Sequence, residues 1–308
     1  MKLVKALRQQ IKKTGRRYRL VYLFALPYAW LFLFWFLPFL IVVGISFSES
    51  VIAIPPYTAL FSKAGEGIFV LKISLSNYLF LISQRLYALA YVNSLVLGFL
   101  TTLFCLVLAY PAAWGLLRLS PSWRFPCLAL LVAPFWIAFL VRIYAWIGLL
   151  SEEGFLSQLL VSLGLLSQGQ GLIGTSLGVL IGMVYTYLPF MILPLYTALE
   201  KIDFSLVEAA FDLGCRPFKV FWKIVLPLSK KGALTGAILV FIPAMGEFAI
   251  PELLGGKKVL MIGQAVWSEF FYNRDWPLAS ALAICMLVTL LPPILLLARL
   301  QKSTNTQD

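Results

Sequence analysis

The sequence predicts an all-α, polytopic membrane protein with six transmembrane helices, and its composition is the first reason. Of the 308 residues, 61% are hydrophobic and only 12% are charged, whereas a soluble domain carries about 25% charged residues. The mean hydropathy is +0.91. Too little polar surface remains to keep a globular fold of this size in water, so the apolar side chains require a bilayer.

Long apolar stretches are the second reason. Each reaches or nearly reaches the roughly 20 residues that a helix needs to cross about 30 Å of hydrocarbon. We expect uninterrupted helices, because backbone groups find no water in lipid, and the strict alternation of a membrane β-barrel is missing. The predicted spans cover residues 20–47, 89–117, 125–150, 172–199, 233–251 and 278–298.

Glycines at a spacing of four residues mark the fourth predicted span. Gly174, Gly178 and Gly182 would lie on one face of a helix there. Small residues at this spacing let a neighbouring helix approach closely. We therefore expect a tight helix contact along this face.

The basic residues predict the orientation. Six spans place both termini on the same side as the loop at 200–232, and that side carries 18 of the 25 Lys and Arg residues. Basic residues stay in the cytoplasm. We therefore expect a basic tail at 1–19, the loop at 200–232 and a tail at 299–308 to be cytoplasmic, flanking a transmembrane domain at 20–298. Apolar residues recur every four positions in the first tail, which fits either an amphipathic surface helix or a solvated segment.

The chain lacks the residues that most enzymes of this size would need. It contains no His, and Cys105, Cys127, Cys215 and Cys285 show no C-x-x-C spacing. We therefore predict no catalytic residue, no metal site and no cofactor bound by this chain. Residues 169–174 match G-x-G-x-x-G, but this pattern binds dinucleotides only between a strand and a helix, and here it leads into a span. No ATP-binding G-x-x-x-x-G-K-[ST] motif is present.

The loop at 200–232 is patterned. Residues 200–213 predict a helix with Leu206, Ala209, Ala210 and Leu213 on one face. Gly214 can end that helix in left-handed geometry, and Pro217 can begin the next one. Two short helices at an angle would form a rigid element for a partner to bind. The alternative is a plain connection whose amphipathic helix faces lipid.

One motif in this loop resembles a known family. The run Glu208-Ala-Ala-x₃-Gly214-x₉-Ile224-x-Leu226-Pro227 is similar to the E-A-A signature of type I ABC importer permeases. The resemblance implies a coupling helix that docks in a cleft of a separate ATPase subunit, which binds the ATP and Mg²⁺. It assigns the coupling role to Glu208, Ala209, Ala210, Gly214, Ile224, Leu226 and Pro227.

A narrower resemblance concerns the cargo. Residues 243–256, 261–263 and 273–277, with 133–136, 142–144 and 188–190, resemble the polyamine branch of these permeases, especially the putrescine-transporter permease. This implies a second permease subunit in a heterodimer, two copies of the ATPase and an external polyamine-binding protein at a bacterial inner membrane. Permeases for iron, sulfate, molybdate or thiamine share the E-A-A loop, so those cargoes remain alternatives to putrescine and spermidine.

An acidic residue supports a cationic cargo independently. Glu247 falls inside the predicted fifth span, where an ionised carboxylate is costly unless it faces a cavity or a partner. Pro243, one turn earlier, predicts a kink and a free carbonyl. We expect Glu247 to lie on the path of a dication, with cation–π contacts available from Trp136, Tyr144, Tyr185 and Tyr187. Alternatively, Glu247 forms a salt bridge with Arg142 and the aromatic rings are interfacial belts.

The segment after the fifth span predicts a short amphipathic helix at 260–271. Glu269 and Asp275 there either steer a cation and contact the binding protein, or lie in a solvated loop. The predicted mechanism is alternating access. Two other classes remain as alternatives: a secondary transporter, which needs ion-coupling residues and related halves, and a membrane enzyme, which needs catalytic groups inside the spans.

Overall fold

The computed structural model describes residues 25–63 and 69–305, and helices dominate them. The predicted tail at 1–19 lies outside the described residues. The all-α prediction is confirmed, with one small addition, an antiparallel hairpin of two three-residue strands. The chain divides into two units, residues 1–78 with 275–281 and residues 79–274 with 282–308. Each is described by itself below.

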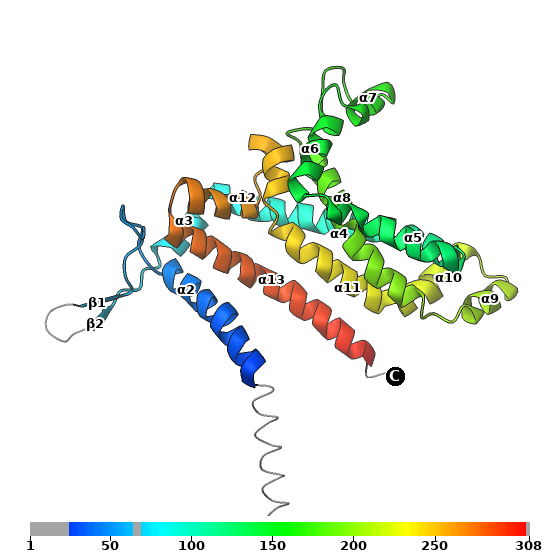
Figure 1. The fold of residues 1–308 in the computed structure, drawn as a ribbon, viewed down its shortest axis with the longest axis horizontal. Coiled ribbons are helices and arrows are strands. Elements are labelled where there is room, and N and C mark those ends of the chain that lie inside the picture. The colour runs from blue at the N-terminus through cyan, green and yellow to red at the C-terminus, as the bar shows by residue number, and fades with distance from the viewer. Residues whose placement is uncertain (1–24, 64–68, 306–308) are drawn as a thin grey trace, which may run out of the picture. The chain divides into compact units, whose positions relative to one another are not determined.

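The elements, in chain order (Figure 1), are η1 Phe32–Phe36, α2 Leu37–Ser46, β1 Phe61–Lys63, β2 Phe69–Leu71, α3 Ser76–Ser83, α4 Arg85–Arg118, α5 Pro121–Val132, η2 Ala133–Trp136, α6 Phe139–Leu150, α7 Phe155–Ser162, α8 Ser176–Leu199, α9 Ser205–Asp212, α10 Pro217–Val220, η3 Phe221–Val225, α11 Leu226–Met245, η4 Pro251–Gly255, η5 Gly256–Lys258, α12 Ile262–Trp267, η6 Ser268–Tyr272 and α13 Trp276–Asn305. The segments η2 and η5 are 3₁₀ turns, and η1, η3, η4 and η6 are π turns.

Five helices of the described residues are long enough to cross a membrane. They cover Ala25–Ser46, Arg85–Arg118, Ser176–Leu199, Pro217–Met245 and Trp276–Leu295. A bent pair, Pro121–Trp136 with Phe139–Ser162, makes a sixth if it is counted as one span. Five of the six predicted spans are therefore present as single helices.

In the first unit, a polar contact fixes the end of the helix Ala25–Ser46. The side-chain amide of Asn77 donates to the backbone carbonyls of Ser46 and Ser48, at 3.0 and 2.8 Å. The Ser46 hydroxyl is 2.7 Å from that of Tyr78. Because Asn77 is buried, these bonds satisfy carbonyls that the helix end leaves unpaired.

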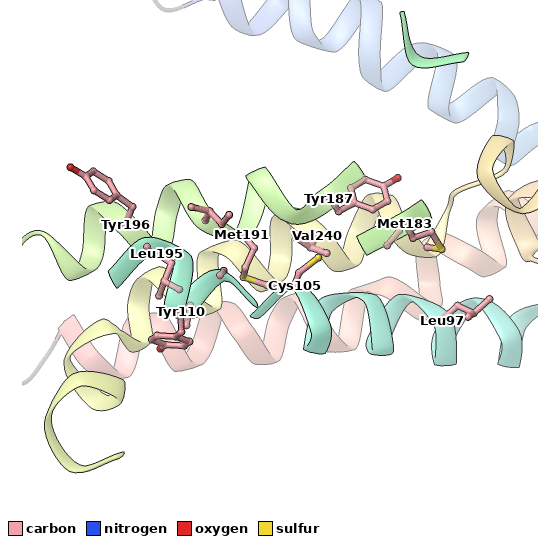
Figure 2. Packing of buried hydrophobic residues seen from close by; sticks show 14 of the residues in the cluster. Leu97, Cys105, Tyr110, Met183, Tyr187, Met191, Leu195, Tyr196 and Val240 are labelled. Atoms are coloured by element: carbon pink, nitrogen blue, oxygen red, sulfur yellow. The ribbon is translucent and has the colours of Figure 1, made fainter. Parts of the chain in front are cut away.

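In the second unit, α4, α8 and α11 pack together as the core (Figure 1). Side chains from all three helices meet along their length (Figure 2). Met183, Met191 and Leu195 of α8 are fully buried, as are Cys105 of α4 and Val240 of α11. The burial of these apolar side chains against one another holds the three helices side by side.

Glycines allow the close contact between α8 and α11. A Cβ added to Gly232 would lie 2.3 Å from the Cβ of Ala198 and 2.7 Å from the carbonyl oxygen of Pro194. At Gly236 it would meet Met191 at 2.6 Å. Of the predicted glycine stripe only Gly182 serves a close contact between segments, because its added Cβ would meet Leu254 at 2.6 Å. Gly174 was wrongly placed in the helix; it precedes α8 with φ +78°.

The third predicted span, 125–150, is not an uninterrupted helix. It breaks between Trp136 and Phe139, and the two halves meet at 93°. Ile137 and Ala138 are extended at the break. Pro134 in η2 explains part of the break, because it cannot donate a helical hydrogen bond. Apolar composition alone gave no sign of the bend.

The fifth predicted span, 233–251, has wrong boundaries at both ends. The helix runs over 29 residues from Pro217 to Met245. It therefore starts inside the predicted loop 200–232 and ends before Glu247. The sixth helix, α13, likewise continues to Asn305, through most of the predicted tail 299–308.

Candidate functional site

The residues of the E-A-A motif lie in a compact turn between two helices. We call residues 203–227 the coupling segment. Glu208, Ala209 and Ala210 lie on α9, and Gly214 follows that helix with φ +76°. Its amide donates to the Phe211 carbonyl at 2.8 Å, and the Cys215 amide donates to the Ala210 carbonyl at 3.0 Å. This pair of bonds is a Schellman motif, which needs a left-handed residue at Gly214. The predicted role of Gly214 as helix terminator is confirmed.

The start of α9 is also fixed by a side chain. The Asp203 carboxylate accepts a hydrogen bond from the Ser205 amide at 3.0 Å. The backbone and side chain of Ser205 lower the pKa of Asp203 below its usual value. The helix is shorter than the predicted 200–213, because residues 200–204 form the turn that leads into it.

The predicted apolar face of α9 is mostly exposed in the structure. Leu206 and Leu213 are exposed, Leu213 by 84%, and Ala209 is exposed as well. Val207 and Ala210 form the buried side instead. The coupling segment thus presents apolar side chains outward, and Phe218 of α10 adds a third with 75% exposure. Glu208 is exposed as well.

The second half of the motif lies on the long helix. Arg216 is extended, Pro217 is the first helical residue as predicted, and α10, η3 and α11 follow without a break. Ile224 is on η3, while Leu226 and Pro227 open α11. These three residues therefore belong to the membrane-crossing helix rather than to a separate short helix. Pro227 follows the π turn Phe221–Val225, where the regular α-helical hydrogen bonding is already interrupted.

Aromatic contacts tie the coupling segment to α4, and a polar contact ties the adjoining start of α11 to the same helix. Phe221 packs edge-on against Tyr110 with ring centroids 5.1 Å apart, and Phe204 packs against Trp114 at 5.7 Å. The Tyr110 hydroxyl is 2.9 Å from the hydroxyl of Ser229. Beside these contacts lies an apolar cavity of about 790 Å³, whose lining includes Val107, Phe211 and Trp222. The segment is thus attached to the core on one side and open on the other.

Glu247 lies in the bend beyond the long helix, not inside it as predicted. Its side chain is 9% exposed. One oxygen, Oε1, accepts from the backbone amides of Phe248, Ala249 and Ile250, at 3.1, 3.0 and 3.4 Å. The other, Oε2, accepts from the Tyr187 hydroxyl at 2.5 Å. Glu247 therefore caps the short helical turn that follows it and ties this turn to α8.

Pro243 lies in the last full turn of the helix, and the chain leaves helical geometry at Gly246. The predicted kink is thus replaced by a helix end. The amide of Glu247 still donates to the Ala244 carbonyl, at 3.4 Å.

The four predicted aromatic residues do not form one cluster. Tyr187 is buried and bonded to Glu247. Tyr185, on another side of α8, packs edge-on against Trp146 at 5.1 Å. Trp136 and Tyr144 are exposed by 84% and 61% at the break and on α6. Of these four residues, only Tyr187 contacts Glu247.

The alternative salt bridge between Glu247 and Arg142 is wrong for the described residues. The Arg142 guanidinium lies over the rings of Phe135 and Phe139, at 5.0 and 5.5 Å from their centroids. Phe135 contacts Phe190 at 5.2 Å, and Phe190 contacts Tyr187 at 6.4 Å. Three rings therefore stand between the cation and the carboxylate.

Sequence reasoning missed the buried state of a second carboxylate. Glu269 is 8% exposed and accepts from the Tyr87 hydroxyl at 2.8 Å and from the Asn273 side chain at 2.9 Å. The predicted helix at 260–271 is present as α12 and η6, but it buries Glu269 instead of exposing it. Asp275 accepts from the Leu278 amide at 3.0 Å and so caps α13. The sequence could have predicted this cap, because Asp275 stands directly before the apolar run that forms α13.

Comparisons with known proteins agree with this arrangement. The family described as "Binding-protein-dependent transport system inner membrane component" matches residues 11–305. The spermidine/putrescine transport system permease protein PotB of Haemophilus influenzae is 38% identical over 281 residues, covering 91% of this chain and 93% of that protein. PotB of Escherichia coli is also 38% identical, covering 85% and 90%. The molybdenum transport permease ModB of Azotobacter vinelandii is 32% identical, covering 53% and 71%.

Solved structures match the fold. A chain of a bacterial ABC transporter that imports the acidic polysaccharide alginate superimposes with a TM-score of 0.67 at 17% identity, covering 96% of this chain and 99% of that one. A chain of the MetNI methionine ABC transporter in an inward-facing conformation gives 0.53 at 16% identity, covering 72% and 98%. At this identity the likeness concerns the fold alone.

Proposed function

Because the chain belongs to the family of binding-protein-dependent inner-membrane transport components, we propose that it imports polyamines as one permease subunit of an ATP-driven transporter. Putrescine is the cargo that we propose first, and spermidine is the second candidate. The chain moves its cargo by alternating access, and a separate ATPase subunit supplies the energy. The cargo proposal is supported by the 38% identity to permeases named for spermidine and putrescine.

The observation that carries the mechanism is the uninterrupted helix from Pro217 to Met245. Its 29 residues correspond to about 43 Å at 1.5 Å per residue. One end begins in the coupling segment, and the other ends two residues before Glu247. A displacement of the coupling segment is thus transmitted along one rigid element to the bend that holds the carboxylate.

The coupling segment is the proposed docking surface for the ATPase, and we place it with both termini in the cytoplasm. Leu206, Leu213 and Phe218 are exposed although they are large and apolar. Exposed apolar side chains on a rigid, capped turn favour a protein partner. The Schellman motif at Gly214 keeps the two helices at a fixed angle, so that force applied to α9 reaches the long helix.

Glu247 is the proposed attraction for the cationic cargo. Its Oε1 is fully engaged by backbone amides, whereas Oε2 accepts a hydrogen bond from the Tyr187 hydroxyl. A carboxylate oxygen can accept more than one hydrogen bond, so Oε2 retains capacity for an ammonium group. The adjacent rings of Tyr187 and Phe190 offer cation–π contacts of about 0.5–2 kcal/mol each.

The complex that we propose has four further chains around this one. A second, different permease subunit completes the membrane core, two ATPase copies bind the coupling segments, and an external binding protein delivers the polyamine. ATP and Mg²⁺ belong to the ATPase copies. A chain of the alginate transporter that matches with a TM-score of 0.67 was solved with a periplasmic protein bound to an alginate pentasaccharide, which supports a separate binding protein.

The test is uptake of labelled putrescine by vesicles that contain the full complex. The wild type is compared with Glu247→Gln, which preserves an acceptor oxygen for the backbone amides but removes the charge. We expect kcat/KM for putrescine to fall roughly tenfold or more, because a hydrogen bond to a charged group contributes about 1.5–3 kcal/mol. Unlabelled spermidine should compete, and molybdate should not.

Three outcomes would contradict the proposal. Competition by molybdate and not by polyamines would assign an oxyanion cargo. Unchanged kinetics in Glu247→Gln would remove Glu247 from the path while leaving the cargo class intact. Uptake that persists without the ATPase subunit would favour an ion-coupled secondary transporter.

A further inference from the structure

Arg142 is a cation in the third apolar segment, and no ion pair joins it to an acidic side chain of the described residues. It lies near the start of α6, beside the break in the third apolar segment. Its Nε atom is buried and has no hydrogen-bond partner. Within residues 25–63 and 69–305, its guanidinium lies over the rings of Phe135 and Phe139. The guanidinium is thus packed on aromatic faces while its buried Nε–H stays without a hydrogen-bond acceptor.

The surroundings of Arg142 make an uncompensated charge unfavourable. A charged side chain in a membrane segment requires a partner or a water-filled cavity. The guanidinium also lies within the first turns of α6, where the positive end of the helix dipole repels a cation. No side chain of the described residues caps the start of α6. Both features call for a negative group that the described residues do not supply.

The adjoining surface is apolar and uncovered. Trp136, Ile137, Leu140, Val141 and Tyr144 are exposed by 84, 52, 54, 58 and 61%. The extended residues Ile137 and Ala138 lie in the same stretch. Non-helical backbone at membrane depth is tolerated only where protein or a water-lined path covers it. Lipid chains alone are therefore a poor cover for this surface.

We infer that Arg142 binds a carboxylate of the second permease subunit, and that Trp136–Tyr144 is the surface on which this subunit packs. The inference rests on the proposed function in one respect, namely that a second permease completes the core. A planar guanidinium suits this role because it can donate two parallel hydrogen bonds to one carboxylate. The polyamine itself is excluded as the counter-charge, because a dication would be repelled.

Charge exchange in the full complex tests the inference. The tagged chain carries Arg142→Glu, Arg142→Lys or the control Arg118→Glu, and the amount of second permease that copurifies is measured. Arg118 is a matched control, because its guanidinium also lies over an aromatic ring, that of Trp114, at 5.8 Å. We expect Arg142→Glu to lower copurification roughly tenfold or more. Arg142→Lys and Arg118→Glu should retain it.

The second arm separates loss of the pair from misfolding. Each Asp and Glu in the spans of the second permease is changed to Lys and combined with Arg142→Glu. We expect one such exchange to restore copurification and uptake, although either single change abolishes them. Normal assembly of Arg142→Glu would overturn the inference, and so would failure of every exchange. Assembly that follows the anionic lipid content of the membrane, independently of those acids, would overturn it in favour of a lipid phosphate.

The copurification readout does not depend on the cargo. If molybdate and not putrescine is transported, the proposed cargo fails, while rescue by charge exchange still supports the interface. If exchange fails and putrescine uptake responds to Glu247→Gln, the interface alone is wrong.

Discussion

The two ends of the helix Pro217–Met245 contrast sharply. At its start, the coupling segment leaves Leu213 and Phe218 largely exposed, and the turn is fixed by backbone hydrogen bonds around Gly214. At its far end, Glu247 is buried, and both of its oxygens are engaged by this chain. One end is therefore open to a protein partner, whereas at the other end the carboxylate is held in place by groups of this chain.

Under the proposed function, this contrast explains how one helix serves two tasks. The start then needs a fixed backbone and free side chains, so that the ATPase subunit can bind and move it. The bend needs a fixed side chain, because a buried charge is tolerated only with several hydrogen bonds. Variants that alter one end and leave the other intact therefore separate coupling from cargo handling.

The largest effect is expected at the bend. In Glu247→Ala, three amides and the Tyr187 hydroxyl lose their acceptor, and an unsatisfied buried group costs about 1–3 kcal/mol. We expect a loss of about 2–4 kcal/mol in the stability of the purified complex, together with loss of uptake. Thermal unfolding in detergent measures it. Glu247→Gln is the control and should unfold close to the wild type; a Glu247→Ala complex that is as stable as both would show that the cap is unimportant.

The next effect is expected at the turn of the coupling segment. Gly214→Val forces a β-branched residue into left-handed geometry, which costs about 1–2 kcal/mol. We expect uptake to fall several-fold more than ATP hydrolysis, because the turn transmits the displacement. Gly164→Val is a matched control: its φ is +73° against +76° at Gly214, and an added Cβ meets no atom within 4 Å at either position. A similar loss of coupling in both variants would refute a special role for the turn.

A smaller effect is expected from the exposed side chains. Leu213→Ser should weaken binding of the ATPase subunit roughly tenfold, since burying a Leu side chain contributes about 1.5–3 kcal/mol. The fold should be unaffected, because Leu213 contributes little to the core. Leu165→Ser is the control, as Leu165 is 72% exposed in the loop between α7 and α8. Affinity is measured by titrating the ATPase onto reconstituted permease; unchanged affinity would place the docking surface elsewhere.

The smallest effect is expected at Tyr187. Tyr187→Phe removes one hydrogen bond to Glu247 and should change putrescine uptake only a few-fold, in line with about 1 kcal/mol for one such bond. Tyr185→Phe retains the ring that packs on Trp146 and should behave as the wild type. A larger effect of Tyr185→Phe than of Tyr187→Phe in the same uptake assay would contradict the arrangement at the bend.

Local chemistry allowed several features to be predicted from the sequence. Apolar stretches identified the membrane class and five single-helix spans, because length and hydropathy are properties of short segments. The E-A-A motif, the left-handed Gly214 and the start at Pro217 were likewise readable, because caps and turns depend on neighbouring residues.

Tertiary structure decided what depends on contacts between distant segments. It broke the third span at Ile137 and Ala138, joined the coupling segment to the fifth span, and turned Val207 rather than Leu206 toward the core. It also gave Glu247 the Tyr187 hydroxyl as its partner instead of Arg142. Apolar residues cover every side of these helices, so their periodicity does not distinguish a face toward protein from one toward lipid. Only packing against α4 and α8 makes that distinction.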